Sequence, residues 1–216
     1  MVGHGDNPTG ASSPPSGAAA GWLDAGSTIA SMEDKAAHEN FAVASRLLPR
    51  AQRSHLLALY AFARLVDDVG DEAPGDRRRL LDVVDDDIDR LVGPTPPALA
   101  VLRDLAPTVR ACHLPLDPFH RLVQANRTDQ TVLRYESYAE LRDYCTLSAN
   151  PIGHLVLGVF DAATPQRLLL SDSVCTALQL VEHWQDVAED YAAGRIYLPQ
   201  DGMRRFGVIE SQLAGR

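Results

Sequence analysis

Apolar residues recur every three or four positions along most of the chain from Glu33 onward, and this spacing is typical of amphipathic helices. We find no convincing run of the apolar–polar alternation that marks a β-strand. The pattern therefore predicts an all-α protein. We expect helices over residues 33–48, 50–70, 76–92, 98–112, 116–126, 137–161 and 165–193, with a further helix beginning after Pro199.

Proline and glycine positions agree with these boundaries. Pro49 suits the first turn of a helix, "GPTPPA" separates two helices, and Pro115 and Pro118 bracket a loop. Residues 1–30 differ, because Gly, Ala, Ser and Pro dominate them and leave too little apolar surface to offset the entropy cost of ordering. We interpret residues 1–30 as a disordered leader and residues 31–216 as one helical domain.

Composition and charge narrow the classes of function. A hydrophobic content of 45% is enough for a packed core. The net charge of -9, with arginines scattered among acids, argues against nucleic-acid binding. Three widely spaced cysteines form neither a disulfide framework nor a paired CxxC metal site. With no signal segment and no membrane-spanning stretch in the sequence, we expect a cytoplasmic protein.

Two acidic stretches stand out. The helix "LYAFARLVDDVGDE" ends in four carboxylates, of which Asp67 and Asp71 are four positions apart and share one helix face. In "ALQLVEHWQDVAEDYAAGRIYLP", Glu182, Asp186 and Asp190 follow the same spacing. Like charges at this spacing destabilise a helix unless a cation lies between them. Both stretches therefore favour a bound cation.

Oxygen donors without interleaved His or Cys suit Mg²⁺, which takes a few carboxylates together with phosphate oxygens and water. Nearby donors suit a diphosphate: Arg64 precedes the first acidic row, and Arg195 and Tyr197 follow the second. Alternatively, each row is an exposed helix face paired with surface cations such as Arg64 or Arg195. One motif alone favours that alternative, whereas two copies beside apolar helix surface favour metal and diphosphate.

Three blocks of the sequence resemble a known family. In order, "ASRLLPRAQRSHLLALYAFARLVDDVGDE", "DYCTLSANPIGHLVLGVF" and "LQLVEHWQDVAEDYAAGRIYLP" resemble the signature blocks of the trans-isoprenyl squalene/phytoene synthases. The segments "ENFAVASRLLP", "SANPIG" and "HWQDVAED" are most similar to the hopanoid-pathway branch, the squalene or hydroxysqualene synthases. The resemblance covers about residues 36–205, and the order and spacing of the blocks make it specific.

The resemblance implies an isoprenoid-synthase helical bundle around a central cavity, with Mg²⁺ bridging two Asp-rich motifs to a substrate diphosphate. It makes Asp67, Asp71, Asp186 and Asp190 the catalytic metal ligands, and Glu182 joins the metal set. The substrate-binding residues that it implies are Arg64, Asp129, Tyr144, Gln179, Arg195 and Tyr197.

Two features depart from the family pattern. Many relatives have Asn at the position of Glu182 and Arg at that of Gln185, so the field around the diphosphate differs here. We interpret this as a sign of a specialised branch that starts from an already condensed substrate. Family members usually continue for several helices after "RIYLP", and we expect this chain to lack those C-terminal helices of the bundle.

The hopanoid branch implies ionisation of presqualene diphosphate and capture of the cation by water to give hydroxysqualene. The alternative within the family is head-to-head condensation of two farnesyl or geranylgeranyl diphosphates to squalene or phytoene. An alternative of another class is a non-catalytic relative that acts as an assembly or lipid-binding protein. A prenyl substrate also implies transient contact with a membrane surface, while the sequence gives no indication of oligomeric state.

Two further observations leave alternatives open. His183, inside the second motif, suits a base that orients the quenching water, although a packing role is the commoner one for such a residue. Small residues follow one another along "YCTLSANPIGHLVLG" and either leave room for a polyisoprenoid chain or permit close helix packing. They are Cys145, Ser148, Ala149, Gly153 and Gly158.

Overall fold

The computed structural model describes Leu23 and residues 48–214. Residues 48–214 contain no β-strand, only an isolated parallel bridge between Arg134 and Ile196, so the expectation of an all-α protein is confirmed. The helices are α3 (Arg50–Asp71), α4 (Arg77–Ile88), α5 (Ala100–Ala111), α6 (Asp117–Asp129), α7 (Tyr138–Ser148), α8 (Asn150–Val159), α9 (Pro165–Gln185), α10 (Val187–Ala192) and α11 (Gln200–Phe206), with 3-10 turns at Asp89–Leu91 and Glu210–Gln212. None of these described helices is long and apolar enough to cross a membrane.

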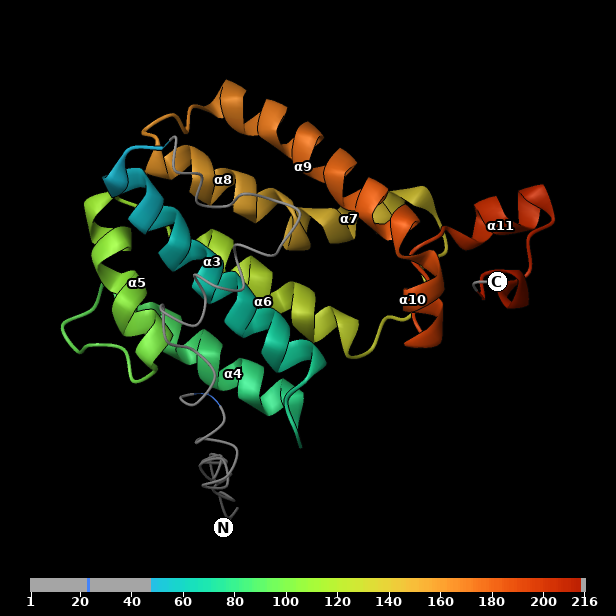
Figure 1. Ribbon diagram of the computed structural model, residues 1–216, viewed down its shortest axis with the longest axis horizontal. Coiled ribbons are helices and arrows are strands. Elements are labelled where there is room, and N and C mark those ends of the chain that lie inside the picture. The colour runs from blue at the N-terminus through green and yellow to red at the C-terminus, as the bar shows by residue number, and fades with distance from the viewer. Residues whose placement is uncertain (1–22, 24–47, 215–216) are drawn as a thin grey trace, which may run out of the picture.

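Helix α3 lies at the centre of the main core, where it packs against α4, α5, α6 and α8 (Figure 1). Its apolar residues recur at helical spacing and are almost fully buried, and Phe62 meets Phe119 of α6 edge to face with ring centroids 5.1 Å apart. Leu23 is 2% exposed and belongs to the same core, although it falls within the predicted leader. The boundary of that leader stays a prediction.

A second, smaller core joins α6, α7, α9 and the segment that follows α10. Its buried members are Ala125, Tyr135, Leu141, Tyr144, Cys145, Leu180 and Tyr197. Three of these are tyrosines, whose rings pack against one another with centroids 5.4–5.8 Å apart. This aromatic core fixes the chain around one end of the site described below.

The predicted helix boundaries hold to within a few residues except at two places. The single helix expected over residues 137–161 is two helices, α7 and α8, because Pro151 has no N–H to continue the hydrogen-bond ladder. The single helix expected over residues 165–193 breaks at Asp186, whose backbone has φ -96° and ψ 12°. The helix predicted over residues 33–48 lies outside the described residues, apart from its last position.

Two of the small residues serve close packing between helices. A Cβ at Gly153 would lie 2.2 Å from Ser171 Oγ and 2.6 Å from Cys175 Sγ of α9. A Cβ at Gly158 would lie 2.5 Å from a methyl carbon of Leu114. These distances are shorter than a carbon atom tolerates, so both glycines let neighbouring segments approach α8.

Candidate active site

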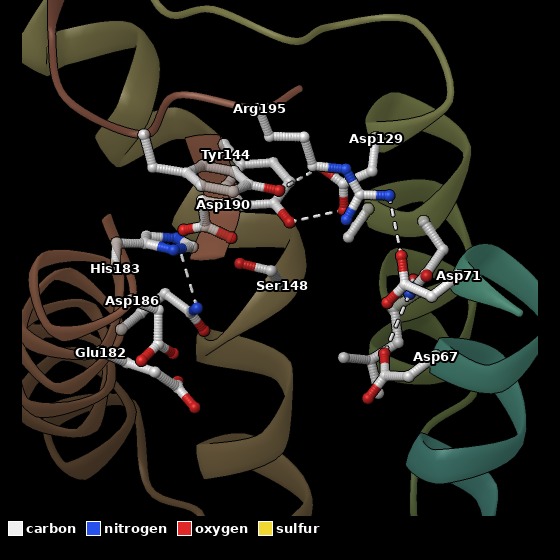
Figure 2. Close-up of a pocket in the computed structure, with 15 residues that line it drawn as sticks. Asp67, Asp71, Asp129, Tyr144, Ser148, Glu182, His183, Asp186, Asp190 and Arg195 are labelled. Atoms are coloured by element: carbon white, nitrogen blue, oxygen red, sulfur yellow. Dashed lines mark hydrogen bonds and ion pairs between the residues drawn. The ribbon is translucent and has the colours of Figure 1, made fainter. Parts of the chain in front are cut away.

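A cavity of about 340 Å³ lies between the end of α3, α6, α7 and the α9–α10 segment. Figure 2 shows its two acidic sides facing each other, with Asp67 and Asp71 on one and Glu182, Asp186 and Asp190 on the other. The lining residues are Asp67, Asp71, Leu122, Ala125, Asn126, Asp129, Tyr144, Ser148, Gln179, Glu182, His183, Asp186, Asp190, Arg195 and Tyr197. The lining thus contains every predicted site residue except Arg64.

Asp67 and Asp71 lie at the C-terminal end of α3, where the helix dipole is negative and adds to their mutual repulsion. Part of Asp67 is open to water in the cavity, yet protein atoms surround its carboxylate. This burial raises the pKa of Asp67 to about 6, against a hydrogen bond from Asn126 Nδ2 (3.2 Å) that lowers it. The negative charge of Asp71 contributes to the rise, so a cation is favoured here.

The opposite acidic side is not one continuous helix. Glu182 lies in α9, Asp186 lies at the break, and Asp190 lies in α10. The N–H of Asp190 still donates to the carbonyl of Asp186 at 2.8 Å, which keeps the two residues one turn apart. Burial raises the pKa of Asp190 to about 6, with a further contribution from the charge of Asp186. This side therefore also carries an excess of negative charge.

Arg195 connects the two sides of the cavity. Its Nη2 donates to Asp71 Oδ1 at 2.7 Å, although Arg195 follows α10 in the chain. The backbone holds the segment in place, because the N–H of Ile196 donates to the carbonyl of Leu133 at 3.0 Å. Arg134 Nη1 donates at 2.7 Å to the carbonyl immediately before Arg195. A guanidinium fixed in this way is suited to bind phosphate oxygens.

Arg64 is placed differently from the expectation. Its Nε lies 2.8 Å from Asp68 Oδ1, one turn along α3, and the side chain does not line the cavity. Its positive charge is still close enough to lower the pKa of Asp67. Direct contact with a substrate therefore stays a prediction, and an electrostatic effect on Asp67 is the role that its position supports.

A buried polar group closes one end of the cavity. Asp129 is 9% exposed and accepts hydrogen bonds from Tyr144 (2.7 Å) and Tyr197 (3.1 Å). The ring of His183 stacks on Tyr197 at 3.9 Å, and its Nε2 lies 3.3 Å from the side-chain nitrogen of Gln179. Burial lowers the pKa of His183 to about 4 and keeps the ring neutral. These contacts agree with the packing interpretation of His183.

Five lining residues were not predicted as site residues: Leu122, Ala125, Asn126, Ser148 and His183, the last of which was considered as a base. Asn126 contacts α3 so closely that a Cβ at Gly70 would lie 2.0 Å from its Oδ1. Because Asn126 and Asp129 are three positions apart and share a helix face, their spacing was a usable signal. Ser148 was noted only for its small size.

The donors present fit Mg²⁺ better than a softer metal, since six carboxylates line the cavity and three of them have raised pKa values. Among the described residues, no three His, Cys, Asp or Glu side chains converge to hold a metal ion by themselves. Mg²⁺ commonly keeps several waters and binds one or two carboxylates plus substrate phosphates. The separation of the acidic sides therefore suits a metal–diphosphate complex.

The sequence of the chain matches a family of enzymes. The family model described as squalene/phytoene synthase matches residues 35–216. The chain is 37% identical over 180 residues to the hydroxysqualene synthase of Zymomonas mobilis, covering 81% of this chain and 59% of that protein. It is 34% identical over 176 residues to the phytoene synthase of Mycobacterium tuberculosis, covering 81% and 57%. The chain thus spans less than two thirds of the length of these relatives.

Solved structures share the same arrangement of helices. The squalene synthase HpnC from Alicyclobacillus acidocaldarius is 41% identical with a TM-score of 0.78, over 86% of this chain and 71% of that one. A dehydrosqualene synthase is 26% identical with a TM-score of 0.75, over 87% and 66%. Together with the match over residues 35–216, these likenesses mean that the chain belongs to the squalene/phytoene synthase family.

Proposed function

We propose that the cavity is the diphosphate-ionising site of a Mg²⁺-dependent, squalene-type isoprenoid synthase. The observation that carries this proposal is that carboxylates from two separate helical segments face one cavity, with a fixed arginine between them. Surface acidic rows that merely pair with neighbouring cations have no reason to face each other in this way.

The acidic and the basic residues of the cavity have different proposed roles. Asp67, Asp71, Glu182, Asp186 and Asp190 would hold Mg²⁺, which when bound neutralises the charge of a leaving diphosphate. Arg195 would exchange its ion pair with Asp71 for hydrogen bonds to diphosphate oxygens. The hydroxyls of Tyr144 and Tyr197, which donate to Asp129, would keep that end of the cavity ordered while the carbon chain reacts.

The finer proposal is that presqualene diphosphate is ionised and that water captures the cation to give hydroxysqualene. Two relatives named hydroxysqualene synthase, from Zymomonas mobilis and Rhodopseudomonas palustris, support it at 37% and 36% identity. This outcome consumes only water, whereas formation of squalene from the same cation requires a hydride donor.

Two alternatives follow from other observations. Condensation of two prenyl diphosphates is supported by relatives named phytoene synthase at 34% identity and presqualene diphosphate synthase at 30%. A non-catalytic relative is less well supported, because the carboxylates on both sides of the cavity are present.

Incubation of the purified protein with presqualene diphosphate or farnesyl diphosphate, with and without Mg²⁺, tests these proposals. We expect Mg²⁺-dependent release of pyrophosphate from presqualene diphosphate and an alcohol product. Asp67→Asn and Asp186→Asn should each reduce release by roughly a hundredfold or more, since each removes a metal ligand. Asp104→Asn, at an exposed carboxylate of α5, is the matched control.

The outcomes separate the alternatives. Products from farnesyl diphosphate alone would favour condensation. A folded protein that releases no pyrophosphate from either substrate would favour the non-catalytic alternative. Equal losses in Asp104→Asn and Asp67→Asn would contradict the metal-binding role of Asp67.

A further inference from the structure

Ser148, the last residue of α7, carries a hydroxyl whose hydrogen-bonding capacity is not used. Its Oγ is buried and has no hydrogen-bond partner among the described residues, although Ser148 lines the cavity. On the same helix, Thr146 instead donates to the carbonyl of Asp143 at 2.6 Å. A buried hydroxyl without a partner is costly, so its environment calls for a polar ligand.

The other hydroxyls that line the cavity are already engaged. Tyr144 and Tyr197 both donate to the carboxylate of Asp129. Figure 2 shows the Ser148 hydroxyl turned toward the side of the cavity where His183 and Asp190 lie. Of the hydroxyls in the described lining, only that of Ser148 has no hydrogen-bond partner.

We infer that Ser148 positions the water molecule that captures the substrate cation, an inference that rests on the function proposed above. A serine hydroxyl accepts a hydrogen bond from water and leaves the lone pairs of the water oxygen facing the cavity. Leu122 and Ala125 supply apolar lining for a hydrocarbon chain, whereas the Ser148 hydroxyl offers a polar position at which a water molecule can be held.

The reaction balances without a reductant. The C–O bond to the diphosphate breaks, and the diphosphate leaves with the electron pair. The water oxygen then forms a bond to the cationic carbon and releases one proton, which the departed diphosphate accepts. The sum is one prenyl diphosphate plus one water giving one alcohol plus one protonated pyrophosphate.

A cation that does not meet this water has a different fate. Loss of a proton from the neighbouring carbon gives a hydrocarbon with one more double bond, and the proton again goes to pyrophosphate. Ser148 is therefore a positioning residue that determines the ratio of alcohol to hydrocarbon. A residue with a purely structural role would change stability or total turnover without changing this ratio.

Product analysis of Ser148→Ala, Ser148→Val and Ser148→Thr from presqualene diphosphate tests the inference. We expect the alcohol-to-hydrocarbon ratio to fall roughly tenfold in Ser148→Ala, the size of one lost hydrogen bond. The ratio should fall further in Ser148→Val, which also fills the water position. Ser148→Thr retains a hydroxyl and should keep the wild-type ratio. Thr146→Ala is the matched control and should keep the wild-type ratio.

The ratio is independent of total turnover, so it separates this inference from the proposed function. An unchanged ratio in both Ser148→Ala and Ser148→Val would overturn the inference while leaving ionisation intact. If the wild-type protein releases no pyrophosphate, the proposed function fails, and a crystal structure then decides about the water. An ordered water within hydrogen-bond distance of Ser148 Oγ, displaced in Ser148→Val, would support its position, and density without that water would overturn it.

Discussion

The two acidic sides of the cavity rest on very different supports. Asp67 and Asp71 end a helix whose other faces are buried among four neighbouring helices. Helix α9 packs on α7 and α8, while its outer face exposes Leu170, Val174, Leu178, Val181 and Trp184, each about half exposed or more. Figure 1 shows α9 along one edge of the molecule, away from α4. One half of the site is thus built into the core, and the other is not.

The comparison also holds within the helices themselves. Helix α3 runs unbroken to Asp71, whereas the opposite row breaks at Asp186 and continues in the six-residue α10, which contributes no buried residue to the described core. Helix α9 is apolar on its outer face as well as on its inner face, a pattern that is typical of a helix in a protein interior. The first side is therefore preformed by packing, and the second depends more on its local hydrogen bonds.

Stability should show the largest contrast between the two supports. Leu81 of α4 is 0% exposed in the main core, so Leu81→Ala should lower the free energy of unfolding by roughly 2–5 kcal/mol. Leu178→Ala on the outer face of α9 should change it by about 0.5 kcal/mol or less, since Leu178 is 56% exposed. Urea titration of both variants measures the difference. Equal losses of unfolding free energy in the two variants would contradict the difference in support between α9 and the main core.

Close packing of α3 on α6 gives the next largest effect. In Gly70→Ala the new methyl would lie 2.0 Å from Asn126 Oδ1, so the amide must shift, which weakens the hydrogen bond that its Nδ2 donates to Asp67. We expect a loss of about 1–3 kcal/mol in unfolding free energy. Gly202→Ala in α11 is the control, because its methyl meets open space among the described residues and alanine favours a helix. A neutral Gly70→Ala would contradict the close approach.

The pH dependence of the metal-free protein tests the charge excess on both sides. Asp67 and Asp190 have pKa values of about 6 when folded, above the ordinary value of 3.8. The folded state therefore binds their protons more tightly, so both carboxylates cost stability above pH 6 and cost less as pH falls toward 4. His183, with its pKa lowered to about 4 from 6.5, acts in the opposite direction over that window.

The pKa of Asp129 is also raised by burial, so three carboxylates oppose one histidine. We therefore expect the melting temperature without metal to be higher near pH 5 than at pH 7.5, by about 2–4 °C for each kcal/mol gained. Mg²⁺ should raise it more at pH 7.5 than at pH 5, since protons compete for the same oxygens. Asp67→Asn should melt higher than wild type at pH 7.5 without metal and respond less to Mg²⁺. A melting temperature that rises steadily with pH in metal-free wild type would contradict this assignment.

The ion pair that joins the two sides should have the smallest effect on stability. Asp71 is 53% exposed in the pair, and Arg195→Gln should therefore cost about 1 kcal/mol or less. Its effect on pyrophosphate binding should be larger, because a bidentate donor to phosphate is lost. Calorimetric titration with pyrophosphate and Mg²⁺ measures this, with Arg121→Gln on α6 as the control. Equal affinities in the two variants would show that Arg195 does not contact the ligand.

The sequence predicted which residues line the cavity better than it predicted where the helices that carry them break. Helical spacing alone placed Asp67 beside Asp71, and α3 has the predicted bounds to within one residue. The break at Asp186 escaped prediction because neither proline nor glycine accompanies it, so the apolar pattern continues through it. The break at Ala149 was readable from Pro151.

Contacts between residues that are far apart in the sequence could not be predicted from spacing along the chain. The pairing of Arg195 with Asp71 spans 124 positions and depends on how α10 returns to the core. The unused hydroxyl of Ser148 is a property of its surroundings, which no spacing along the chain reveals.

The break at Asp186 divides the second acidic side between two helices. Glu182 is carried by a long helix seated on α7 and α8, while Asp190 and the chain leading to Arg195 belong to a separate short rod. The hydrogen bonds from Ile196 N–H to Leu133 and from Arg134 to the carbonyl before Arg195 hold this second segment in place independently of α9. The interruption of the helix thus allows the chain after α9 to change direction, so that Arg195 reaches Asp71 on the opposite side of the cavity.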